Sequence, residues 1–165
     1  MEPAGFEDFV SREQPALLRL AVLLAGDRGH AEDLVQTALL KTYRHWGRIT
    51  RHGDPTAYVR RVLVTTHTSW RRRLSTTEQV VEVLPERVDP AEQRDDDEEL
   101  RAALRSLPPR MRAAVVLRYY ADLSELQTAQ LMGCSESTVN TQTTRGLARL
   151  RALLAAPVLV PEEGL

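Results

Sequence analysis

The sequence predicts an all-α protein made of two small helical domains joined by an acidic, flexible linker. Apolar residues recur at helical spacing along most of the 165-residue chain, and no stretch shows the strict alternation of a half-buried strand. Residues 75–98 carry two prolines, an aspartate run and few large apolar side chains, so they cannot supply a core. We therefore expect domains at residues 1–74 and 99–156, a linker at 75–98 and a short tail at 157–165.

The first domain is expected to contain three helices. The first covers residues 6–24, is kinked or divided by Pro15, and stops at Gly26. The second covers residues 30–47, and residues 48–53 then form a loop. Asp54 caps a third helix that has proline at its first position and runs to residue 74. Its spacing predicts two faces: Tyr58, Val59, Val62, Thr66 and Trp70 buried, and Arg61, Thr65, Thr68 and Arg72 exposed.

The second domain begins with a helix from residue 99 that breaks at Pro108-Pro109, followed by a helix over 110–121. The pattern over residues 125–147 then predicts a helix-turn-helix. Ala129, Gly133 and Val139 stand where that motif needs a small residue, a turn glycine and a β-branched core residue. Ser135 is placed to cap the second helix. The inner face of that helix is expected to be Val139, Thr143, Gly146, Leu147, Leu150 and Leu154.

The outer face of the same helix carries groups that can read DNA in the major groove. Asn140 can pair with adenine through two hydrogen bonds, and Arg145 can pair with guanine in the same way. The alternative is a plain helical hairpin with a solvated polar face. The residues assigned to DNA contact are Ser137, Thr138, Asn140, Thr141, Thr144 and Arg145.

The net charge of -1 conceals strongly charged blocks. Counting residues gives +6 over 48–73 and +5 over 101–156, on either side of -8 over 74–100. Such asymmetry favours a polyanionic partner for the two basic blocks.

Several classes of protein lack their signatures in this sequence. The four histidines are never at the spacing that places two metal ligands on one helix face, and no phosphate-loop, dinucleotide or nucleophile-elbow motif occurs. Cys134 has no nearby histidine and is expected to be a small packing residue. We expect no enzyme activity, metal or cofactor. A single cysteine, an acidic start and no long apolar run predict a cytoplasmic protein without a signal peptide or membrane span.

Two sets of motifs resemble the extracytoplasmic-function sigma factors of bacteria. Residues 26–36 (GDRGHAEDLVQ), 57–62 (AYVRRV) and 70–73 (WRRR) resemble their region 2. Residues 107–120 and 132–139 (MGCSESTV) resemble their region 4. The runs QTTRGL and VTT are most similar to the actinobacterial branch called SigE-like. The resemblance implies a protein that binds core RNA polymerase, directs it to promoters and helps to melt them.

The resemblance also implies roles for residues of the first domain. Asp33 and Gln36 match the family's clamp-binding positions, and a carboxylate there suits an arginine-rich surface. Without the resemblance, this face reads as ordinary solvated surface. The polymerase-binding set is Asp33, Gln36, Thr37, Leu40 and Lys41; the implied partners are the beta-prime clamp and beta flap of core polymerase, promoter DNA and a candidate anti-sigma factor.

The loop at residues 48–54 matches the family loop that captures a flipped base of the minus-ten element. Such a loop needs cationic and planar groups to offset the cost of unstacking. The residues assigned to minus-ten DNA are Arg48, Arg51, His52, Arg61, Thr65 and Arg72. Departures from the family pattern occur at Val64-Thr65, Ser69, Asn140 and Gln142, so promoter sequence cannot be carried over.

Two alternatives to the sigma-factor interpretation remain open from the sequence. One is a stand-alone helix-turn-helix regulator with a helical sensing or dimerisation domain, and the other is a helical adaptor that does not bind DNA. The acidic linker also has two interpretations: it follows the path of a nucleic acid through the polymerase, or it is a solvated tether.

Overall fold

The structure is a computed structural model that describes residues 5–76 and 96–155. The first part contains α1 (Phe6–Ala25), α2 (Arg28–Arg44), α3 (Trp46–His52) and α4 (Pro55–Thr76). The second contains α5 (Asp96–Ser106), α6 (Pro109–Val115), the π-helix η1 (Val116–Tyr120), α7 (Glu125–Met132) and α8 (Glu136–Leu154). The predicted all-α fold is confirmed, and the described residues contain no strand. Most of the predicted linker and the tail lie outside the described residues.

Local sequence signals explain most helix ends. The carboxylate of Asp27 accepts a hydrogen bond from the backbone N–H of His30 at 3.1 Å and so caps α2. The turn between α7 and α8 uses Gly133 at φ +67°, a left-handed conformation that suits glycine. The hydroxyl of Ser135 then accepts from the N–H of Thr138 at 3.0 Å, as predicted for the cap of α8. α1 is continuous through Pro15, so the proline does not divide it.

The expectation of a loop at residues 48–53 is wrong, because these residues belong to α3. α2 ends three residues before Gly47, and the chain turns at His45. The short α3 is held by its apolar side, since Trp46 and Ile49 are both 6% exposed. The ring of Trp46 packs against Phe6 and Phe9 of α1, at centroid distances of 5.3 and 5.0 Å. Burial of these rings offsets the weak propensity of a seven-residue helix.

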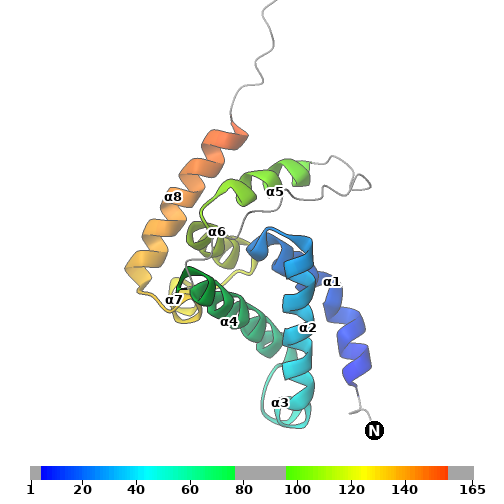
Figure 1. Cartoon of the computed structure of the whole chain (residues 1–165). Helices are drawn as coiled ribbons and strands as arrows, with labels where there is room; N and C mark the ends of the chain where they lie inside the picture. The colour runs from blue at the N-terminus through cyan, green and yellow to red at the C-terminus, as the bar shows by residue number, and fades with distance from the viewer. Residues whose placement is uncertain (1–4, 77–95, 156–165) are drawn as a thin grey trace, which may run out of the picture.

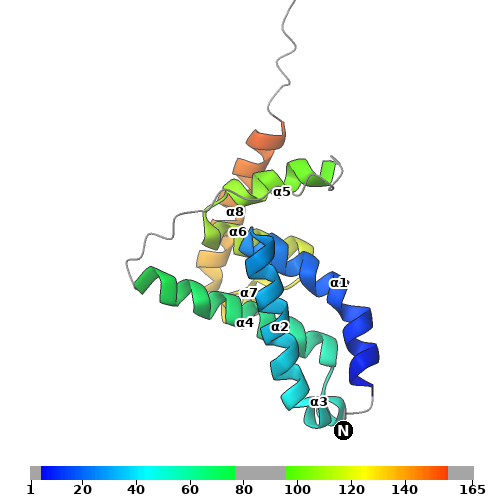
Figure 2. The same cartoon turned by 45° about the vertical axis from the view of Figure 1, so that its right-hand side comes forward.

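The first lobe packs α1 and α4 against α2, and α3 closes one end (Figure 1). In the second lobe, α8 packs along α6 and α7 and also contacts α5. The inner face predicted for α8 is confirmed at Val139, Thr143, Gly146 and Leu150, which are all buried. It is wrong at Leu154, whose side chain is 40% exposed because α8 extends past the helices that cover it (Figure 2).

The two lobes lie directly against each other. α6 and η1 contact α1, and α7 contacts the side of α4 (Figures 1 and 2). One cluster of buried apolar side chains runs through both lobes, from Leu24 and Leu34 in the first to Leu107 and Met111 in the second. The described residues therefore share one continuous core.

A buried arginine crosses the junction between the lobes. Arg112 of α6 is only 6% exposed. Its Nε donates to the carbonyl oxygen of Leu24 at 3.1 Å, and its Nη1 donates to the carbonyl oxygen of Arg105 at 3.3 Å. The first bond satisfies a carbonyl at the C-terminal end of α1, where a helix favours positive charge. The last turn of α1 carries no basic residue of its own, so Arg112 supplies that charge from the other lobe.

His67 of α4 is also buried, at 4% exposure, and neither ring nitrogen has a hydrogen-bond partner. Burial first, and then the positive charges of Arg71 and Arg112 and the neighbouring His30, lower its pKa from 6.5 to about 4. The unfolded chain therefore binds a proton at His67 at higher pH than the folded chain does. The free energy of unfolding should be unaffected by this group above pH 6.5 and should decrease as pH falls toward 4.

Urea unfolding at pH 7.5 and pH 5 measures this effect, and the contribution of His67 to the loss should be about 2 kcal/mol. His67→Leu provides the control, because it removes the titrating group and keeps an apolar side chain of similar size. The variant should lose correspondingly less stability over the same interval. Equal losses in the wild type and the variant would show that His67 does not titrate between these values.

Candidate nucleic-acid and protein interfaces

The face of α8 that is predicted to read DNA is well formed. Ser137, Asn140, Thr141, Thr144 and Arg145 are exposed, and Thr138 is half-buried beside the cap. The hydroxyl of Ser135 contacts the hydroxyl of Thr138 at 2.9 Å, so Thr138 takes part in the cap of the helix. The remaining five side chains share one outward surface of the first three turns. The structure therefore brings together the predicted DNA-reading residues and gives Thr138 an additional structural task.

A glutamate outside the predicted DNA-contact set touches this face. The side-chain Nδ2 of Asn140 donates to Oε1 of Glu125 at 3.1 Å. Glu125 is the first residue of α7, next to Ser124, which forms a reciprocal capping box with Gln127. The two contacting residues lie 15 positions apart, so no periodicity within one helix indicates the pair. The only signal in the sequence was the position of Glu125 at the start of the helix-turn-helix.

The predicted minus-ten residues divide between α3 and α4. Arg48, Arg51 and His52 are exposed on α3, and Nε of Arg51 donates to the carbonyl oxygen of Gly47 at 3.1 Å. This bond holds the guanidinium along the short helix. On α4, Arg61 and Thr65 are exposed one turn apart. The hydroxyl of Thr65 donates to the carbonyl oxygen of Arg61.

Arg72 belongs to α4, but its side chain lies outside the part of the chain that the structure describes. The aromatic residues Trp46, Tyr58 and Trp70 are buried or half-buried, as expected for core packing. The exposed groups of α3 and of the outer side of α4 thus form a polar, cationic surface without an aromatic platform among the described side chains.

The predicted polymerase-binding residues lie along α2, but not all on one open face. Asp33, Gln36 and Leu40 are exposed at spacings of three and four, and Leu40 is 53% exposed. Thr37 is half-buried, and the ammonium of Lys41 donates to the hydroxyl of Thr66 at 3.4 Å. Lys41 is exposed as well, but its ammonium reaches toward α4. The other exposed side chains of the set, Asp33, Gln36 and Leu40, form a stripe along α2.

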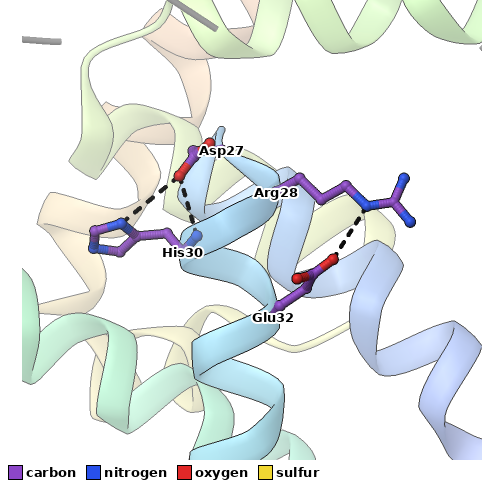
Figure 3. Close-up of polar contacts among 4 residues, drawn as sticks. All are labelled: Asp27, Arg28, His30 and Glu32. Atoms are coloured by element: carbon purple, nitrogen blue, oxygen red, sulfur yellow. Dashed lines mark hydrogen bonds and ion pairs between the residues drawn. The ribbon is translucent and has the colours of Figure 1, made fainter. Parts of the chain in front are cut away.

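The start of α2 is anchored by two local pairs, which Figure 3 shows. Asp27 accepts from the backbone of His30 and lies 3.8 Å from its Nδ1. One turn apart, Nε of Arg28 donates to Oε1 of Glu32 at 3.3 Å. These exposed pairs each contribute little free energy, but they fix the first turn of the helix that presents Asp33.

Among the described residues, no group of three or more histidine, cysteine, aspartate or glutamate side chains is placed to hold a metal ion. None of the helices in residues 5–76 and 96–155 combines the length and apolar character needed to cross a membrane. Cys134 is half-buried and packs against the core.

Both lobes match known families. Residues 9–77 match the family described as Sigma-70 region 2, and residues 97–150 match Sigma-70, region 4. The chain is 42% identical over 157 residues to an RNA polymerase sigma-E factor of Streptomyces coelicolor, covering 94% of this chain and 89% of that protein. It is 30% identical over 152 residues to ECF RNA polymerase sigma factor SigM of Mycobacterium tuberculosis, covering 91% and 77%.

The fold has a counterpart among solved structures. A co-crystal structure of the sigma factor RpoE with the anti-sigma factor NepR from Bartonella quintana matches with a TM-score of 0.69 and 25% identity, covering 91% of this chain and 96% of that chain. The sequence match spans both lobes in the same order, and the helix-turn-helix occupies the region 4 match. The chain therefore belongs to the sigma-70 family of RNA polymerase sigma factors, in its extracytoplasmic-function branch.

Proposed function

We propose that this chain binds core RNA polymerase in the cytoplasm, directs it to a set of promoters and helps to melt them. The observation that carries the proposal is the presence, on one chain of this family, of a formed recognition helix and a separate exposed stripe on α2. In the proposal, α8 reads the minus-thirty-five element, and the exposed groups of α3 and α4 contact the minus-ten element. The stripe of Asp33, Gln36 and Leu40 binds the beta-prime clamp.

The second lobe supplies the remaining contacts in this proposal. It meets the beta flap of the polymerase while α8 lies on DNA. An anti-sigma factor is a further proposed partner, supported by the structural likeness to a sigma factor crystallised with one. A stand-alone regulator is less favoured, because the first lobe matches region 2 and not a sensing or dimerisation domain.

Run-off transcription with purified core polymerase tests the proposal directly. A library of promoters with varied minus-ten and minus-thirty-five elements should give transcripts from a selected subset only when this protein is present. Co-elution with core polymerase on a sizing column provides an independent measure of binding. Absence of both transcripts and co-elution would contradict the proposal, whereas tight promoter binding without polymerase would favour the stand-alone regulator.

Arg145→Ala should separate the roles of the two lobes. The guanidinium is exposed on the recognition face, so its loss should weaken promoter-dependent transcription by about 5- to 150-fold, the range for one bidentate base contact. Affinity for core polymerase should stay within about twofold. Arg151→Ala is the matched control, because it removes the same charge from the last turn of the same helix. Equal loss of core affinity and promoter recognition in Arg145→Ala would contradict this division.

A further inference from the structure

We propose that Glu125 is a positioning residue that sets the base preference of Asn140. This inference rests on the proposed contact between α8 and the minus-thirty-five element and deepens it. The carboxylate of Glu125 has no hydrogen to donate, so only the Nδ2 of the Asn140 amide can face it, at 3.1 Å. The amide oxygen of Asn140 therefore points away from Glu125.

This orientation matters because an asparagine amide can present its donor and acceptor in either order. Reading adenine requires the amide oxygen to accept from the base amino group and Nδ2 to donate to the ring nitrogen N7. Nδ2 carries two hydrogens, and Glu125 uses one, which leaves one for N7. The capping box of Ser124 and Gln127 fixes the backbone at the start of α7. Glu125 therefore orients the Asn140 amide from a well-fixed backbone position.

A promoter library with all four bases at each minus-thirty-five position tests the role in holoenzyme. Asn140→Ala first identifies the position at which preference for adenine is lost. At that position Glu125→Ala should lower the preference by about 2- to 12-fold, the range for one net hydrogen bond. Glu125→Gln keeps an acceptor oxygen and should keep the preference within about twofold. Adding Glu125→Ala to Asn140→Ala should cause no further loss.

The outcomes separate this inference from the proposed function. If Asn140→Ala loses the preference but Glu125→Ala retains it, or if Glu125→Gln loses as much as Glu125→Ala, Glu125 does not position the amide. If Asn140→Ala changes no preference while promoter-dependent transcription persists, the contact of Asn140 itself is wrong, and the role of Glu125 with it. Thermal unfolding of both Glu125 variants distinguishes base preference from stability of α7.

Discussion

Gly146→Val is expected to lower the free energy of unfolding by about 3 kcal/mol, the upper part of the usual range for overpacking a core. Gly146 lies where α8 crosses α6, and a Cβ there would stand 2.5 Å from Cγ2 of Val115 and 3.0 Å from Cγ of Met111. Met111 is flexible and can move. Val115 is β-branched and 5% exposed, so its side chain is restricted in χ1 and closely surrounded. The helices must therefore separate, and the orientation of α8 changes with them.

Alanine variants at two glycines show whether sterics or helix propensity decides the result. Gly146→Ala gains about 1 kcal/mol of helix propensity but still places the Cβ against Val115, so it should destabilise by about 1 kcal/mol net. Gly47 is an exposed position of α3. A Cβ there would meet only the end of the Arg51 side chain at 3.5 Å, so Gly47→Ala should be neutral or stabilising. Urea unfolding compares the variants. If Gly146→Ala were more stable than the wild type, α8 and α6 would have to be farther apart than the 2.5 Å contact with Val115 indicates.

The position of Gly146 illustrates what the sequence could predict. Its spacing from Val139, Thr143 and Leu150 placed it on the inner face of α8, and all four are buried. Periodicity reports which side of a helix is buried because that depends on residues within the helix. It does not identify the residue opposite, since Val115 is 31 positions away in another helix. The need for glycine, rather than any small residue, follows only from that contact.

The difference between patterns within one helix and contacts between helices also explains which expectations were wrong. The expectation of a loop at residues 48–53 followed local signals, whereas α3 is held by rings of α1 that pack on Trp46. Arg112 and His67 are ionisable residues, yet each is at most 6% exposed. Arg112 is buried where the second lobe meets α1, and no pattern within either lobe indicates that contact. The helix-turn-helix was predictable because its cap, turn glycine and core residues are all local.

Asp33→Arg is expected to weaken binding of core polymerase by about 30-fold or more and to leave the fold intact. Asp33 is exposed on α2 in the same stripe as Gln36 and Leu40. In the proposed complex its carboxylate faces arginine side chains of the clamp, and reversing the charge replaces attraction by repulsion of desolvated groups. Fluorescence titration of labelled protein with core polymerase measures the loss, and a thermal melt should stay within about 2 °C of the wild type.

Glu7→Arg makes the same charge change in the first turn of α1, which is exposed and outside the stripe. It should bind core polymerase within about threefold of the wild type. If both variants lose affinity equally, long-range charge and not the α2 stripe governs association, and raising the salt concentration should then reduce both effects. If only Asp33→Arg loses affinity for core polymerase, and the loss persists at high salt, the polymerase must contact α2 closely at this position. Because Leu40 lies in that contact and is uncharged, Leu40→Ala should then weaken binding at every salt concentration by a similar factor.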